Sequence, residues 1–241
     1  MTSKMKVKNA RRFYYAFVAC IILMICIISM TFNSPPRELE LKRSSHCVKV
    51  KYVNADNVPD AVIYYSFATI PTQEQLINES TTIFRGTVRD IKNIEISHGG
   101  DSKDYKAIAT IQVIETYKGD TIPGELVQML VPCPINGTWV KNSFAEALSV
   151  MQVKTEGIFM PIKYDDTSIF NYSDGVILCF EEICEYGLQN GALDVFVETE
   201  QGRIVYFERA FDIYRVPITL DAIGDHISVI LDKAEKSVKT E

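Results

Sequence analysis

The fold of this chain is decided by a stretch that reads TTIFRGTVRDIKNIEIS over residues 81–97 and, after the loop HGGDSKD (98–104), YKAIATIQVIETYK over residues 105–118. Both segments are rich in β-branched and aromatic residues, which favours long β-strands. In the second segment small apolar side chains alternate with polar ones, as in a half-buried strand. Gly86 interrupts the first segment, where a bend or bulge is usual. The loop has the composition of a turn, so the stretch predicts a long hairpin.

Shorter strands and a few helices are expected on both sides of this hairpin. Thr72 and Gln75 form a capping box, which predicts a short helix within residues 72–80. An apolar stripe at helical spacing predicts a terminal helix over residues 219–236, and another short helix is expected within residues 140–152. Further strands are expected at 46–53, 62–67, 125–131, 157–164, 175–181, 192–199 and 203–209. The predicted fold class is mainly β (α+β).

The order of these elements, with long strands bent at a glycine, is that of an OB-type β-barrel. Four segments carry a family resemblance: IFRGTVRDI, YKAIATIQVIETYKGD, GELVQMLVP and EGIFMPIKY. They resemble small extracytoplasmic OB-like domains of bacterial surface proteins, which are relatives of the netrin/metalloproteinase-inhibitor-like barrels. The resemblance covers residues 72–165 and matches the family's short helix at Gln73–Asn78, its G-T-V strand at Gly86–Val88 and its Y-K-G-D turn at Tyr117–Asp120. It implies an OB-like β-barrel with short helices and a C-terminal helix, and a binding module rather than an enzyme.

An N-terminal segment has the composition of a membrane anchor. Residues 13–32 read FYYAFVACIILMICIISMTF and carry no charge, and at ~1.5 Å rise per residue they cover the roughly 30 Å hydrocarbon core of a bilayer. Basic residues gather before this run and place the N-terminus in the cytoplasm; they are Lys4, Lys6, Lys8, Arg11 and Arg12. The predicted organisation is a basic cytoplasmic tail over 1–12, one spanning helix over 13–32, a polar stalk over 33–45 and an extracytoplasmic domain over 46–241.

Two alternatives to an uncleaved anchor stay open. A cleaved signal peptide has an apolar region of about 7–15 residues that ends in small residues, whereas this run is longer and ends in Ile28, Ser29 and Met30. A lipid-modified cysteine is disfavoured, because Cys20 follows the last arginine too closely and Cys26 lacks a small residue before it. The anchor also separates the chain from the metalloproteinase inhibitors it resembles, which bind zinc through a free N-terminal cysteine.

The charge of the chain restricts its partners. The net charge is −6 and the first 34 residues carry +5, which leaves −11 for residues 35–241. An acidic domain argues against nucleic acid and against docking on anionic lipid, because both repel negative charge. The expected contact with the membrane is therefore the single spanning helix.

Four cysteines lie outside the predicted anchor, at Cys47, Cys133, Cys179 and Cys184. An even number in an extracytoplasmic domain is compatible with two disulfides, and four cysteines allow three pairings. Cys179 and Cys184 could close a small loop across a turn, which would leave Cys47 for Cys133. Four buried, reduced thiols are the alternative. Neither a CxxC motif nor a Cys/His zinc spacing occurs in the sequence.

The sequence contains no recognisable catalytic, cofactor-binding or metal-ligating pattern. HExxH, GxSxG, GxGxxG and Walker loops are missing. The histidines, which are His46, His98 and His226, lack the Cys–His or carboxylate–His spacing of a nucleophilic site. His98 is expected to be exposed in its glycine-rich loop, and the acidic pair Glu181–Glu182 to lie in a solvated turn.

These observations lead to three hypotheses about function. The first is a membrane-anchored, non-enzymatic surface domain that binds a protein, a peptide or a cell-wall component, with no cofactor. The second is an extracytoplasmic hydrolase whose scattered carboxylates are not recognisable in one sequence. The third is an assembly subunit, whose spanning helix pairs with another membrane protein. The anchor together with the missing catalytic pattern favours the first hypothesis.

Overall fold

The computed structural model describes residues 37–59, 70–135, 146–172, 175–211, 213 and 218–238. The predicted tail and anchor, residues 33–36 of the predicted stalk, the strand expected at 62–67 and the first half of the helix expected within 140–152 lie outside these residues. In the part of the chain that is described, no helix is both long enough and apolar enough to cross a membrane. The predicted spanning helix therefore stays a prediction.

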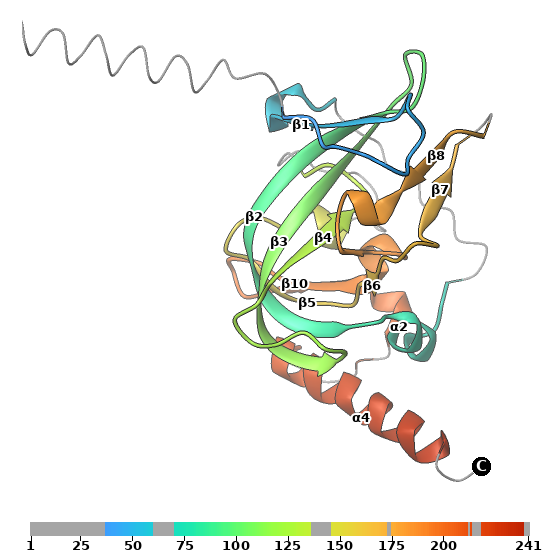
Figure 1. Cartoon of the computed structure of the whole chain (residues 1–241). Coiled ribbons are helices and arrows are strands. Elements are labelled where there is room, and N and C mark those ends of the chain that lie inside the picture. The colour runs from blue at the N-terminus through green and yellow to red at the C-terminus, as the bar shows by residue number, and fades with distance from the viewer. Residues whose placement is uncertain are drawn as a thin grey trace, which may run out of the picture. The chain divides into compact units, whose positions relative to one another are not determined.

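A single curled sheet dominates the described residues, and Figure 1 shows it bending into a half-barrel. Eight strands follow one another in the order β11-β10-β5-β2-β3-β4-β9-β6, and β1 pairs with the far half of β2. Neighbours are antiparallel except β4 and β9. The strands are β1 (Lys49–Val53), β2 (Ile83–Ser97), β3 (Lys103–Lys118), β4 (Leu126–Val131), β5 (Glu156–Phe159), β6 (Ile162–Lys163), β9 (Tyr186–Gly187), β10 (Val195–Glu198) and β11 (Ile204–Val205). The prediction of a mainly β, barrel-like fold is confirmed.

The long hairpin predicted from the central stretch is β2 and β3, which pair along almost their whole length. The bend predicted at Gly86 is also confirmed, because the pairing register shifts between Arg85 and Gly86. A side chain at Gly86 would lie 2.6 Å from a methyl group of Ile111 and 2.7 Å from the carbonyl oxygen of Gln112. Glycine therefore lets the two strands approach closely where the sheet curls.

Each face of the sheet has its own core. Alternate residues of β3, such as Ala109 and Ile111, pack against α3 (Glu146–Ser149) on one face. Ile83 and Phe196 lie under α2 (Gln73–Glu79) and α4 (Leu220–Val238) in a second core. The capping box predicted for α2 is confirmed, since Thr72 and Gln75 bond to each other's backbone N–H groups. Both predicted helices thus cover the sheet.

A third core lies at the end of the sheet where β1 pairs with β2. Ile108 of β3 and Leu130 of β4 pack there against Leu178. Leu178 belongs to a separate two-stranded hairpin formed by β7 (Ile169–Asn171) and β8 (Ile177–Cys179). This β7–β8 hairpin, drawn in orange in Figure 1, covers one face of β3 and β4. It is the element that creates the candidate functional site.

Several predicted strands are shorter or divided in the structure. The strand expected at 157–164 is two strands, β5 and β6, which separate at Pro161 because proline cannot donate to a sheet ladder. The strands expected at 175–181, 192–199 and 203–209 shrink to β8, β10 and β11, and β8 and β10 each adjoin a 3₁₀ turn. β7 and β9 were not predicted. They are three and two residues long, respectively, too short for an alternating pattern to be recognised.

Candidate functional site

A cavity of about 380 Å³ lies between the β7–β8 hairpin and the face of β3 and β4 that this hairpin covers. Its volume falls in the range of about 300–1,000 Å³ that is usual for small-molecule sites. Apolar and polar side chains both contribute to its wall. The lining residues include Lys106, Leu130, Ile162, Tyr164, Ile169, Phe180 and Leu188.

Lys106 is the only positively charged side chain in the described wall of this cavity. It follows Asp104 and precedes Ile108 at alternate positions of β3, so the three share one face of the strand. In the described part of the chain its ammonium group has no carboxylate within 4.0 Å and no hydrogen-bond acceptor. Part of the side chain reaches solvent, but protein atoms surround the ammonium densely. Desolvation therefore lowers the pKa of Lys106, against a smaller opposing effect of Asp104 and Cys133.

Tyr164 brings a second polar group to the same wall. Its ring stacks on Phe180 with the ring centres 5.2 Å apart, and its hydroxyl lies against the bare Cα of Gly187. Desolvation raises the pKa of Tyr164. Like Lys106, the hydroxyl has no hydrogen-bond partner among the described residues. Two residues with unsatisfied donors therefore line one cavity, and such groups call for an explanation.

Aromatic rings hold the β7–β8 hairpin over the cavity. Phe170 packs edge-on to Tyr172 at 4.8 Å between ring centres and lies 6.1 Å from Phe180. Tyr172 in turn stacks on His98 at 3.8 Å. The prediction that His98 is exposed is wrong, because the Tyr172 ring covers it and leaves 18% of its side chain accessible. The loop between β2 and β3 thereby becomes a support for the hairpin.

Asp104 completes this contact rather than neutralising Lys106. The hydroxyl of Tyr172 donates to Oδ2 of Asp104 at 3.0 Å, and Nε2 of His98 lies 3.6 Å from the same oxygen. The bond to a carboxylate and burial together raise the pKa of Tyr172, burial contributing more. The three groups join the β7–β8 hairpin to β3 and the loop before it, and they lie next to the cavity rather than in its wall.

A second set of hydrogen bonds joins the start of the described chain to the turn after β8. The carboxylate of Glu182 accepts hydrogen bonds from the backbone N–H groups of Lys42, Arg43 and Ser44 and from the hydroxyl of Ser44. Desolvation raises the pKa of Glu182, but these donors outweigh it and lower the pKa to about 2. Glu181 also pairs with Arg43. The acidic pair is therefore a binding point for residues 42–44, not the solvated turn that was predicted.

The four cysteines are free thiols in the structure, and only Cys47 is exposed. Burial raises the pKa of Cys133 and of Cys184 to about 12, so both are protonated at neutral pH. Cys179 is buried as well. A disulfide among the four stays a prediction. No three His, Cys, Asp or Glu side chains of the described ranges gather as metal ligands would.

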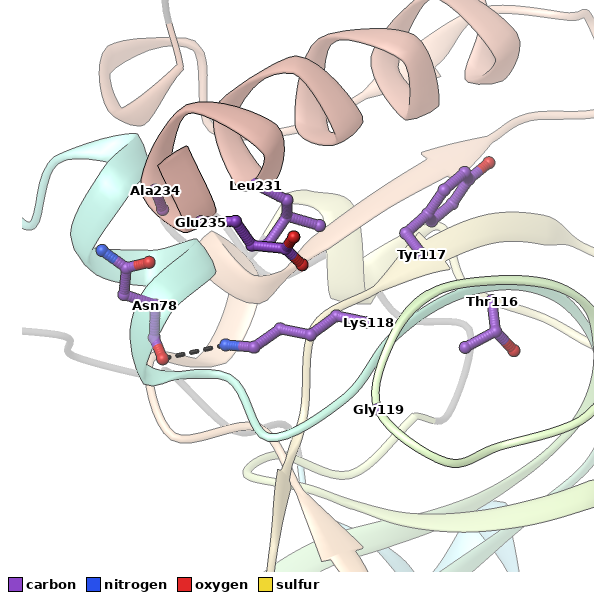
Figure 2. Close-up of a pocket in the computed structure, with 8 residues that line it drawn as sticks. All are labelled: Asn78, Thr116, Tyr117, Lys118, Gly119, Leu231, Ala234 and Glu235. Carbon is purple, nitrogen blue, oxygen red and sulfur yellow. Dashed lines mark hydrogen bonds between the residues drawn. The ribbon is translucent and has the colours of Figure 1, made fainter. Parts of the chain in front are cut away.

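A larger cavity of about 610 Å³ lies between the end of β3, α2 and α4, and Figure 2 shows the residues around it. Its lysine is already used by the fold. Nζ of Lys118 donates to the carbonyl oxygens of Ile77 and Asn78 at 2.8 and 2.9 Å, and so caps the end of α2. The hydroxyl of Thr116 likewise donates to the carbonyl of Thr121. Of the two lysines that line these cavities, Lys106 is therefore the one without a partner among the described residues.

Together, the fold and the cavity define a barrel-like β domain with a site of small-molecule size. No family model matches the chain, and no curated protein and no solved structure matches it significantly. The OB-like family predicted from the sequence therefore stays a prediction, and function has to be inferred from the geometry of the chain itself.

Proposed function

We propose that the chain is a single-pass, membrane-anchored binding domain of OB-like type, and that it takes a ligand into the cavity beneath the β7–β8 hairpin. The apolar run at 13–32 and the basic residues before it support an anchor with the domain outside the cytoplasm. The ligand is a protein, a peptide, a cell-wall component or a fragment of one, and the domain acts without catalysis.

One observation carries the binding proposal. Lys106 lines the cavity, and its ammonium has neither a counter-ion nor an acceptor among the described residues. A desolvated cation without a partner costs folding free energy, and such costs are typical of functional sites. An apolar pocket with a few convergent polar groups is also the usual form of a ligand site. Among the described residues, no comparable observation favours a hydrolase or an assembly subunit.

Ligand binding is tested by saturation-transfer NMR, which detects the binding of small aromatic fragments to the full-length chain in lipid nanodiscs. The set of fragments includes neutral and charged compounds. Ile169 is 39% exposed on β7 and lines the cavity. Ile169→Trp is therefore expected to fill the cavity while the sheet stays folded, and to abolish binding of the fragments that occupy it. Val153→Trp is the matched control at a 49% exposed position away from the cavity. If every fragment that binds wild type also binds Ile169→Trp, the cavity is not a ligand site.

The topology is tested by labelling intact cells with a membrane-impermeant maleimide. Cys47 is the one exposed thiol in the described chain, so labelling is expected at that residue and is expected to disappear in Cys47→Ser. Labelling of Cys47 only after permeabilisation would place the domain inside the cell and refute the surface location. Buried Cys133 serves as an internal reference, since its labelling reports unfolding.

A further inference from the structure

We infer that the ligand of this cavity is a monocarboxylate with a compact apolar or aromatic body, whose carboxylate is bound by Lys106 and Tyr164. The inference rests on the proposed function and names the chemical class of its ligand. It follows from the hydrogen-bond donors, the charge and the apolar surface in the wall of the cavity.

The wall of the cavity includes hydrogen-bond donors that have no partner among the described residues. The ammonium of Lys106 and the hydroxyl of Tyr164 are donors that bond to no described residue, and both residues line the cavity. Thr167 and Ser168 also line it, but each hydroxyl already donates to Oδ1 of Asp165, at 2.7 and 3.1 Å. The exposed Gln189 lines it as well, and its uncharged amide both donates and accepts. An acceptor with more than one lone pair therefore complements the two donors of Lys106 and Tyr164. A carboxylate has two oxygens, which can accept from both.

The charge of the wall limits the charge of the ligand. Lys106 provides one positive charge, and no arginine is among the described lining residues. Leu130, Phe180 and Leu188 surround it with apolar surface, where a second negative charge would be desolvated without compensation. A phosphate carries more than one charge near neutral pH and usually requires several donors or an arginine. A monoanion fits this balance better than a dianion does.

The remaining wall selects the body of the ligand. The stacked rings of Tyr164 and Phe180 and the aliphatic side chains of Ile162 and Ile169 offer a flat apolar surface. Burial of apolar area there stabilises a complex by roughly 25 cal/mol per Å² of area removed from water, which is the main source of affinity for a small guest. A carboxylate joined to a phenyl ring or a branched alkyl chain therefore matches both halves of the site.

The inference is tested by calorimetric titration of the full-length chain in nanodiscs with 4-phenylbutyrate and with its uncharged amide, 4-phenylbutyramide; empty nanodiscs provide the blank. Wild type is expected to bind the carboxylate at least about tenfold more tightly than the amide, since a bond to a charged group is worth about 1.5–3 kcal/mol. Lys106→Met is expected to remove this preference but retain binding of the amide. Lys49→Met, which deletes one charge at an exposed residue of β1, is expected to retain it.

Tyr164→Phe adds a second readout. It keeps the stacked ring and deletes only the hydroxyl, so the preference for the carboxylate is expected to fall by roughly two- to tenfold. Equal affinity of wild type for both compounds, or a preference that survives in Lys106→Met, would overturn the inference. If neutral fragments still bind wild type and not Ile169→Trp, the proposed function stands without it. If no fragment depends on the cavity, both are refuted.

The carboxylate can come from a free acid or from the end of a polypeptide. N-acetylphenylalanine and its amide, titrated in the same way, represent the second source. Preference for both acids over both amides supports the carboxylate as the shared feature. A larger preference within the N-acetylated pair than within the phenylbutyrate pair identifies a chain terminus as the natural source of the carboxylate.

Discussion

The stability of this domain is expected to fall as the pH rises towards 7, because of one buried acid. Asp194 is the last residue of the 3₁₀ turn that precedes β10, and it is 1% exposed. Desolvation raises its pKa to about 7, although the backbone N–H and side-chain amide of Asn190 donate to it and lower the pKa; the nearby charge of Glu79 raises it further. The folded chain therefore keeps a proton that the unfolded chain releases.

The size of the effect follows from the two pKa values. The unfolded carboxyl titrates near 3.8 and the folded one near 7. Between these values the folded state binds more protons than the unfolded state, so the free energy of unfolding decreases with rising pH. The decrease is about 1.4 kcal/mol per pH unit and about 4 kcal/mol in total. The contribution is fully present below pH 4 and lost above pH 7.

Asp194→Asn is the matching perturbation. The amide keeps the volume and one acceptor for the backbone N–H of Asn190, and it does not ionise. Urea unfolding of wild type and variant is measured at pH 5, 6, 7 and 8. The free energy of unfolding of the variant is expected to rise relative to that of wild type by about 1.4 kcal/mol per pH unit up to pH 7. Asp56→Asn, at an exposed position, is expected to show no such trend. A difference between Asp194→Asn and wild type that stays constant from pH 5 to 8 would refute the reasoning.

Three further predictions concern the hydrogen bonds of Glu182, the sheet and the ligand. Glu182→Gln is expected to lower the free energy of unfolding by about 1–2 kcal/mol at neutral pH after allowance for solvent screening. Because the folded pKa of Glu182 is lowered to about 2, this difference is present above pH 4.5 and disappears as the pH falls to 2, as thermal unfolding across that range would show. Gly157→Ala is expected to cost about 2–3 kcal/mol in urea unfolding, because the added methyl meets the carbonyl oxygen of Phe196; an unchanged midpoint contradicts this. Affinity for 4-phenylbutyrate is expected to fall as rising pH removes the proton of Lys106, whose pKa desolvation lowers against Asp104 and Cys133, while affinity for the amide stays constant in the same titrations.

The parts of the fold that could be predicted from the sequence depend on neighbours in the chain. The β2–β3 hairpin has its alternation, its turn and its bulge within residues 81–118, and Thr72 meets Gln75 within one helical turn. Such patterns are local, and their physical cause is contained in the segment itself. The C-terminal helix α4 follows the same rule, because its apolar stripe is visible at helical spacing.

The candidate site could not be predicted, because each of its features depends on a distant segment. Lys106 appears in sequence as one polar residue at the exposed face of an alternating strand, and only the β7–β8 hairpin makes it a desolvated cation. Tyr164 loses its polar partners where it lies against Gly187. Glu182 meets Ser44 across 138 residues. A cation at an alternate position of a strand, followed later by a short aromatic hairpin such as that around Phe170, is the one signal that could have pointed there.

The bond between Ser44 and Glu182 also sets an order of events during folding. The β2–β3 hairpin closes over a short loop and can form while the chain is still being made, whereas a contact across 138 residues has to wait for the later segment. Residues 42–44 are synthesised early and stay without their partner until Glu182 emerges. The ligand cavity, whose wall runs from Lys106 to Gln189, is completed at the same late stage. A nascent or truncated chain can therefore possess most of the sheet and still have no place for a ligand.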